Sequence, residues 1–262
     1  MAPLSTGTSR QSRSTVSSLS RSEIGFSESV ALLLDRMDVR RAETAEEREN
    51  IYRLRYQAYL REGAISPNHT KTFSDPYDES ENAYLFGLYL DGELVSSIRM
   101  HIGSREHPKF PSLEAFADVL QPEVDAGKVI IDSTRFVSDE ATSRMHRGLP
   151  YVTIRLGWMA AIYFNAEHLL AAVRPEHQGF YRRTFHHRLI CEARPYPRLA
   201  RPICLMTVHF AAVADHLYQR YPFFRSTLFE RRMMFERSAA PKPAQSEDHL
   251  TPVVSESPGL AG

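Results

Sequence analysis

Two oppositely charged residues, Asp132 and Arg135, lie three positions apart inside an otherwise apolar stretch, KVIIDSTRFVSD (128–139). The apolar run 129–131 predicts a strand buried on both faces, and the run resumes at Phe136. Because side chains alternate between the faces of a strand, the acid and the base can share a face only where a bulge or a splayed strand end breaks the alternation. They form either a buried ion pair that fixes strand register or a site for proton transfer with Asp132 as the base.

Four more charged residues could belong to the same site. Arg99 lies among apolar residues of a predicted strand, and with Arg135 it could hold a carboxylate through parallel hydrogen bonds. Asp75 and Asp78 lie near the end of a polar loop. They could order that loop by pairing with Arg55 or contact a substrate directly, and the sequence leaves both alternatives open.

The elements that would position these residues follow from hydrophobic periodicity. Thr44 and Glu47 form a capping box before a helix that stops at Gly63, and Asp91-Gly92 marks a hairpin. Helices are predicted at 45–63, 113–120, 149–166 (largely buried), from 175 onward and at 212–221, and segment 22–37 is either a helix or a loop. Strands are predicted at 38–42, 84–90, 93–102, 128–136, 168–173, 188–191 and 203–210. This order predicts an α/β sandwich around a mixed sheet, and the lack of a Gly-rich dinucleotide loop argues against the doubly wound nucleotide-binding folds.

Length and composition are typical of a globular chain with one large domain. The 262 residues are 42% hydrophobic, enough for a sizeable core. We expect the domain at 21–237, between a disordered N-terminal segment (1–20) and a disordered C-terminal tail (238–262) that hold too few apolar residues to fold.

Charge and cysteine content narrow the possible partners. The formal net charge is zero, so neither nucleic acid nor a charged membrane surface is predicted as a partner. No apolar run approaches the ~20 residues of a membrane span. With no apolar leader, Cys191 and Cys204 are expected to be free thiols in the cytoplasm. His186 and His187 lack the spacing of a metal site, so no metal is predicted, and the oligomeric state is left open.

At the level of motifs the chain resembles a known superfamily. The element order and the passage HLLAAVRPEHQGFYRRTF (168–185) are similar to those of the GNAT acyltransferases. Four motifs are similar in order and spacing to the signature of the autoinducer-synthase branch: Arg55-x-x-x-Tyr59, Asp75-Pro-Tyr-Asp78, Ile98-Arg99 and Asp132-Ser-Thr-Arg135-Phe136. That branch holds acyl-homoserine-lactone synthases and N-acyl amino acid synthases, which use acyl chains carried on acyl carrier protein, and the resemblance covers about residues 38–237.

The resemblance implies a fold, a reaction and a set of roles. The fold is a GNAT-like three-layer sandwich around a mixed, mostly antiparallel sheet. The reaction joins a fatty acyl group from acyl carrier protein to the amine of an amino acid or similar small amine, with acyl-phosphopantetheine as donor and no tightly bound cofactor. Asp132 would be the base or part of a water-mediated relay, acting with Arg135. The expected substrate-binding residues are Arg55, Tyr59, Asp75, Asp78, Arg99 and Phe136.

Three residues depart from the pattern of the branch. Tyr59 replaces the usual Phe, Asp132 replaces a Glu with one more methylene, and Ile65 stands where lactone synthases tend to carry Trp. Ile65 argues against the first alternative, an acyl-homoserine-lactone synthase that uses S-adenosylmethionine. The second alternative is a non-catalytic acyl-binding or scaffold protein, which the replacement of Glu by Asp132 would indicate.

The segment 144–148 is not the Gly-spaced pyrophosphate loop of acetyl-CoA users. Its absence favours an acyl donor whose pantetheine arm is attached to a protein.

Arginines cluster around the strand and helix that begin at residue 168. Carrier proteins are acidic, so an enzyme that uses one needs a local basic patch. The predicted docking residues are Arg174, Arg182, Arg183, Arg188 and Arg194. The alternative is a solvated helix face.

Overall fold

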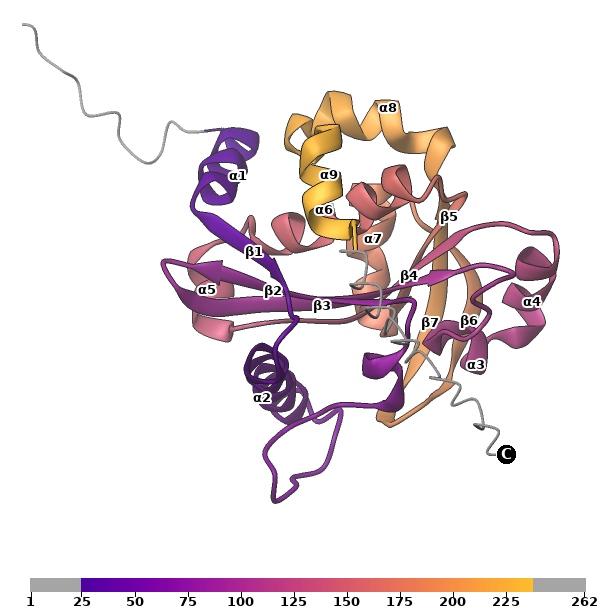
Figure 1. Ribbon diagram of the computed structural model, residues 1–262, viewed down its shortest axis with the longest axis horizontal. Coiled ribbons are helices and arrows are strands. Elements are labelled where there is room, and N and C mark those ends of the chain that lie inside the picture. The colour runs from indigo at the N-terminus through magenta and orange to yellow at the C-terminus, as the bar shows by residue number, and fades with distance from the viewer. Residues whose placement is uncertain (1–24, 238–262) are drawn as a thin grey trace, which may run out of the picture.

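The computed structural model describes residues 25–237, in which helices and strands alternate along the chain (Figure 1). The strands are β1 (Met37–Arg41), β2 (Ala83–Leu90), β3 (Glu93–Gly103), β4 (Ile130–Ser138), β5 (His168–Val173), β6 (Arg188–Tyr196) and β7 (Leu199–His209). The helices are α1 (Phe26–Asp35), α2 (Ala45–Arg61), α3 (Pro111–Ala115), α4 (Ala117–Asp125), α5 (Glu140–Met145), α6 (Leu149–Tyr163), α7 (Gln178–Phe185), α8 (Phe210–Arg220) and α9 (Leu228–Phe235), with short 3-10 turns η1 (Pro76–Glu79), η2 (Pro175–His177) and η3 (Pro222–Phe224). The terminal segments predicted to be disordered, 1–20 and 238–262, lie outside the described residues.

The seven strands of the described chain form one sheet in the order β1-β2-β3-β4-β5-β7-β6. Within it β4 and β5 run parallel, and every other neighbouring pair is antiparallel. The β2-β3 hairpin turns at Asp91 and Gly92, whose φ angles of 52° and 90° are the positive values that a tight hairpin turn requires. The predicted mixed, mostly antiparallel sheet is confirmed.

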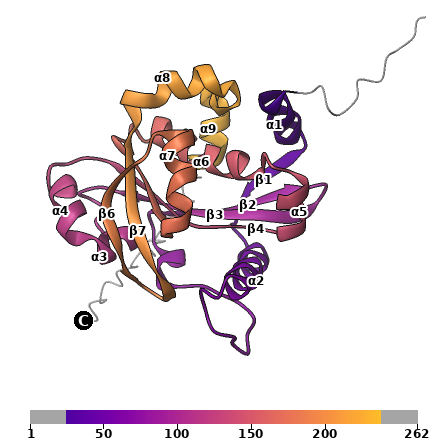
Figure 2. The same ribbon diagram turned by 180° about the vertical axis from the view of Figure 1, so that it is seen from behind.

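Helices cover both faces of the sheet and give the molecule three layers. Figures 1 and 2 show α2 and α3 on one side and α1, α6, α8 and α9 on the other. The larger core, which includes Trp158 and Phe86, fills the α6 side, and a smaller core with Phe116 and Ile130 lies against α3 and α4. α6 contacts the sheet, α1 and α9, which explains why its sequence is apolar nearly all round.

A bulge in β4 breaks the regular alternation of side chains. Ser97 of β3 pairs with Val137 and Arg99 pairs with Thr134, so two residues of β4 oppose one residue of β3. One of the two, Arg135, has a positive φ of 55°. On the other edge of β4, pairing with β5 ends at Ser133, and the two strands then separate. Both the bulge and the splayed end allowed by the sequence are therefore present.

The structure differs from the predicted elements in four places. The single helix predicted at 113–120 is wrong: the chain forms two short helices, α3 and α4, because Phe116 between them turns into the core with φ of −132°. The strands around residue 195 extend into a long β6-β7 hairpin. α5 and α9 were not predicted, although Thr227 and Glu230 form a capping box at the start of α9.

Across residues 25–237, no helix is both long and apolar enough to cross a bilayer.

Candidate active site

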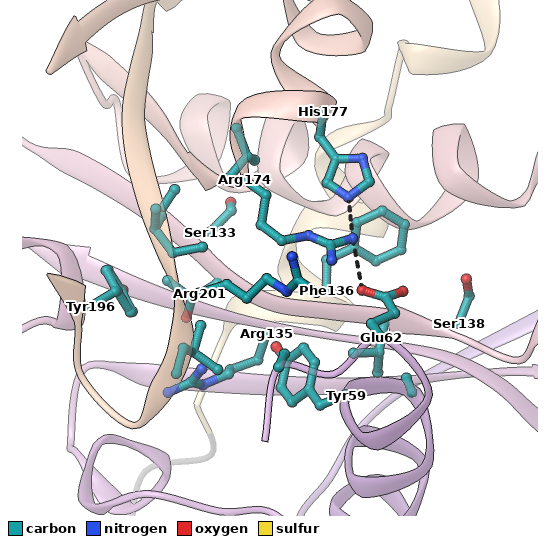
Figure 3. Close-up of a pocket in the computed structure, with 18 of the residues that line it drawn as sticks. Tyr59, Glu62, Ser133, Arg135, Phe136, Ser138, Arg174, His177, Tyr196 and Arg201 are labelled. Atoms are coloured by element: carbon teal, nitrogen blue, oxygen red, sulfur yellow. Dashed lines mark hydrogen bonds and ion pairs between the residues drawn. The ribbon is translucent and has the colours of Figure 1, made fainter. Parts of the chain in front are cut away.

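A pocket of about 400 Å³ opens where β4 and β5 separate. One wall is residues 133–138 of β4, and the opposite wall is the end of β5 with the first turns of α7. α2 contributes Tyr59 and Glu62, and the β6-β7 hairpin contributes Tyr196 and Arg201 (Figure 3). Within residues 25–237, β4 has no strand partner on this edge beyond Ser133, so its backbone N–H and C=O groups there are available to a ligand.

Three arginines and two aspartates form a buried ion-pair network next to the pocket. Asp75 accepts hydrogen bonds from Arg99 Nη1 at 2.6 Å and from Arg135 Nη2 at 2.6 Å. Asp78 accepts from Arg55 Nη1 at 2.8 Å and lies 2.9 Å from Arg99 Nη1. The five side chains are at most 3% exposed. The network alone carries one excess positive charge.

The pKa values of both aspartates in this network are lowered. Burial on its own would raise the pKa of each carboxyl. The positive charges of Arg99 and Arg135 hold the pKa of Asp75 well below its ordinary value, and Arg55 and Arg99 lower the pKa of Asp78. Both aspartates are therefore charged at neutral pH.

The Asp-Pro-Tyr-Asp segment folds into a turn that presents both carboxylates to the sheet. The Asp75 side chain accepts from the backbone N–H of Tyr77 at 3.0 Å, and the Asp78 side chain accepts from the backbone N–H of Asp75 at 2.9 Å. Pro76 at the first position of η1 fits because that position needs no hydrogen-bond donor. Each carboxylate thus binds an arginine and caps the turn, which holds the loop against β3 and β4.

The structure decides between several alternatives left open by the sequence. Asp78 pairs with Arg55, as the loop-ordering alternative predicts, but Asp75 pairs with Arg99 and Arg135 and not with Arg55. Arg99 and Arg135, expected to hold the carboxylate of a substrate, instead both bind the carboxylate of Asp75. Asp132 and Arg135 form no ion pair with each other, because the bulge directs Arg135 to Asp75 and Asp132 bonds to Ser112.

Asp132 is fully buried and does not line the pocket. Its carboxylate accepts from the backbone N–H of Ser112 at 2.9 Å and from Ser112 Oγ at 2.6 Å, at the start of α3. Burial raises the pKa of Asp132, although the Ser112 hydrogen bonds and the charges of Arg99 and Arg135 oppose the rise. A carboxyl with a raised pKa beside a cleft is a candidate for proton transfer.

Tyr196 lies near both the pocket and this buried carboxylate. It lines the pocket, and burial followed by the negative charge of Asp132 raises the pKa of its phenol. The hydroxyl lies close to Ser112 but has no partner in hydrogen-bond geometry among the described residues.

Two of the predicted substrate-binding residues line the pocket itself. Tyr59 packs edge-on against Phe73 with ring centroids 5.2 Å apart, and the Arg135 guanidinium lies 5.9 Å from its ring. Phe136 follows the bulge and also lines the pocket. The other predicted residues, Arg55, Asp75, Asp78 and Arg99, lie in the buried network.

Sequence reasoning missed Tyr196 and Arg201, which line the pocket from the β6-β7 hairpin. The interval 192–202 gave no motif, because its arginines and prolines break the alternation of a strand.

The five predicted docking arginines do not share one surface. Arg182 and Arg183 are exposed on α7, and Arg188 is exposed at the start of β6. Arg174 lines the pocket and pairs with Glu62 at 2.9 Å. Arg194 pairs with Asp118 of α4 at 2.8 Å and packs over Phe116, in the smaller core.

Comparison with known proteins places the chain in a family. The family model of the N-acyl amino acid synthase FeeM matches residues 50–209, which includes the Asp75, Asp78, Arg99 and Asp132 motifs. The structure is similar to that of FeeM, an N-acyl amino acid synthase from uncultured soil microbes, with a TM-score of 0.58 and 17% identity over 72% of this chain and 98% of that chain.

A second similar structure is BjaI, a CoA-dependent acyl-homoserine lactone synthase, with a TM-score of 0.50 and 11% identity over 71% of this chain and 89% of that chain. Among curated proteins, no sequence matches this chain. Likenesses at these identities show a shared GNAT acyltransferase fold, and the family match adds the reaction class. The chain therefore belongs to the FeeM family of N-acyl amino acid synthases, in the autoinducer-synthase branch of the GNAT acyltransferases, and its reaction transfers an acyl group to an amine.

Proposed function

We propose that this chain joins a fatty acyl group, delivered as a thioester on acyl carrier protein, to the amine of an amino acid. The observation that carries the proposal is the pocket between β4 and β5, whose lining combines apolar side chains such as Phe136, Val137 and Ile203 with charged ones such as Glu62, Arg174 and Arg201. A long acyl chain needs the first feature, and a charged small substrate needs the second.

The depth of the pocket suits an acyl chain. Phe136 and Tyr181 line the pocket and also a second cavity of about 20 Å³ behind it. Most of the other lining residues are apolar, such as Leu169 of β5 and Ile154 and Gly157 of α6, and the polar ones are Ser133 and His187. We infer that the acyl chain lies between the separated strands with its far end toward α6.

The reaction needs a deprotonated amine and hydrogen-bond donors for the developing oxyanion. The amine nitrogen attacks the thioester carbon, the C–N bond forms and the C–S bond breaks. The proton from the incoming ammonium would reach Asp132 through Tyr196 or a water, and the proton left on nitrogen after attack would go to the departing thiolate. The unpaired backbone edge of β4 would supply N–H donors to the oxyanion.

The buried network has a positioning role in this proposal. Arg135 stabilises the bulge by its bonds to Asp75, and Arg99 ties the same carboxylate to β3. The bulge in turn sets the direction of the β4 backbone in the pocket. Arg55 and Asp78 hold the loop that closes this face, and Tyr59 and Phe136 would contact the substrates directly.

Two features favour acyl carrier protein over free CoA as the donor. The segment that leads into α6, Arg144-Met-His-Arg-Gly148, does not have the glycine spacing of the pyrophosphate loop of acetyl-CoA users. Arg182 and Arg183 are exposed on the helix whose first turns line the pocket. A carrier-protein donor would place the reaction in the cytoplasm.

Mass spectrometry of lipid extracts from cells that overproduce the protein tests the proposal. N-acyl amino acids that accumulate only in the producing cells are the expected result. Accumulation of acyl-homoserine lactones would assign the chain to the S-adenosylmethionine-dependent alternative, and unchanged extracts from cells with folded protein would favour a non-catalytic role.

A further inference from the structure

Arg201 differs from the other cations that line the pocket because its charge is not neutralised. Arg135 is bound to Asp75, and Arg174 is paired with Glu62 at 2.9 Å and with Glu176 at 3.2 Å. Arg61, the remaining arginine of the lining, lies 3.8 Å from Glu140 and 3.9 Å from Glu62. Arg201 has neither an ion pair nor a hydrogen bond within residues 25–237.

The position of Arg201 directs its charge into the pocket. It lies in the first residues of β7, just after the turn of the β6-β7 hairpin, and it lines the pocket together with Tyr196. Figure 3 shows its side chain extending across the pocket toward Arg174 and Phe136, whereas the Arg135 guanidinium is bound to Asp75 of the network. Among the charged residues that line the pocket, Glu62 is the one acid, and Arg174 already binds it. The part of the pocket around Arg201, whose side chain is exposed, is therefore suited to an anion.

We propose that Arg201 binds the carboxylate of the amino-acid substrate, and this inference rests on the proposed function. A planar guanidinium can donate two parallel hydrogen bonds to a carboxylate. In an α-amino acid the carboxylate and the amine share one carbon, so fixing the carboxylate also fixes the amine relative to the thioester. Arg201 takes the role that the sequence suggested for Arg99 and Arg135, whose guanidinium groups Asp75 occupies.

The test compares an amino acid with its uncharged carboxamide as acceptor, for the wild type and for Arg201→Met. The wild type should strongly prefer the amino acid. Arg201→Met should raise the KM for the amino acid about 10- to 100-fold, the usual size of a lost charge-assisted pair, and leave the KM for the carboxamide and for the acyl donor nearly unchanged. Arg201→Lys keeps the positive charge but cannot donate two parallel hydrogen bonds, so its KM for the amino acid should lie between those of the wild type and of Arg201→Met.

Arg198→Asn is the matched control. Arg198 lies in the same hairpin and carries the same charge, but it lines a separate shallow pocket, and Asn tolerates its positive φ of 62°. This variant should keep the preference of the wild type.

Three outcomes would count against the inference. An amino acid to carboxamide ratio unchanged in Arg201→Met would overturn it while leaving the proposed function standing. A raised KM for the acyl donor alone would assign Arg201 to the phosphate of the pantetheine arm instead. Absence of any N-acyl amino acid with the wild type would overturn the proposed function, and this inference with it.

Discussion

At the scale of single residues, Asp132 combines full burial with hydrogen bonds from one serine and no ion pair. We predict that Asp132→Asn lowers acyl transfer by at least ~100-fold, the usual loss when a general base is removed. The wild-type rate should fall as the pH drops through the raised pKa of this carboxyl, and the rate of the variant should not show this fall. Steady-state kinetics against pH checks both statements.

The same substitution should not weaken the fold. A carboxyl whose folded pKa is raised binds its proton more tightly in the folded state, so its charge reduces stability at pH values above the ordinary value of 3.8. Asp132→Asn removes that charge, and an amide can keep both contacts with Ser112. The melting temperature at pH 7 should therefore stay the same or rise. A folded variant with near-normal turnover would reassign Asp132 to a structural role.

Asp75 should behave in the opposite way, because its charge stabilises the fold. We predict that Asp75→Asn lowers the free energy of unfolding by about 3–5 kcal/mol, since two buried guanidinium groups lose their partner. Urea denaturation measures this loss.

The pH dependence of stability gives a second measure of Asp75. Because the folded pKa is lowered, its contribution is fully present above the ordinary value of 3.8 and is lost as the pH falls through the lower folded value. Asp118→Asn, which removes one partner of an exposed pair with Arg194, is the control and should change stability little. Equal stability of the two variants would mean that the network does not hold the fold.

At the scale of elements, the proposed position of the acyl chain puts its far end against α6. A Cβ added at Gly157 would lie 3.1 Å from Ser133 Oγ and 3.2 Å from Leu169 Cδ1, at the small cavity behind the pocket. We predict that Gly157→Ala shifts the preferred donor to shorter chains and lowers kcat/KM for the longest accepted chain by about 10-fold relative to a chain two carbons shorter. Competition between donors of different length measures the ratio.

Gly87→Ala provides the matched control for that experiment. It also crowds its surroundings, with Leu94 and Tyr89 atoms at 3.0 Å, but Gly87 lines neither cavity. Its chain-length preference should equal that of the wild type. A Gly157→Ala variant with wild-type preference would place the end of the acyl chain elsewhere.

Much of the architecture could be predicted from elements with strong local signals. The Thr44 capping box, the Asp91-Gly92 turn and the all-round apolar α6 each encode their structure in neighbouring residues. The partner of Arg135 could not be predicted in this way. Arg135 binds Asp75, 60 positions away, only because a bulge at positive φ redirects it, and strand alternation alone gives no sign of which residue will bulge.

The pocket wall formed by the β6-β7 hairpin was missed for a related reason. Tyr196 and Arg201 reach the site through the order of strands in the sheet, which brings β7 beside β5. Local sequence does not specify that neighbour, so site residues on the hairpin carry no motif of their own.

At the scale of the whole molecule, the zero net charge leaves docking of an acidic partner to local patches. We predict that the double variant Arg182→Glu, Arg183→Glu raises the KM for acyl carrier protein and removes most of its salt dependence, because exposed charges act through long-range attraction that salt screens. Transfer from acyl-CoA, if it occurs, should change less. Unchanged carrier-protein kinetics in the double variant would exclude this surface of α7.

A reconstituted reaction tests the central claim most directly. Purified protein is mixed with acyl carrier protein loaded with a fatty acyl group and with the proteinogenic amino acids, with and without S-adenosylmethionine, and the products are separated and weighed by mass spectrometry. The account predicts an N-acyl amino acid whose formation needs the wild-type protein and the loaded carrier, does not need S-adenosylmethionine, and is nearly abolished by Asp132→Asn. A lactone that forms only with S-adenosylmethionine, or no product from folded wild-type protein with any amino acid, would contradict it.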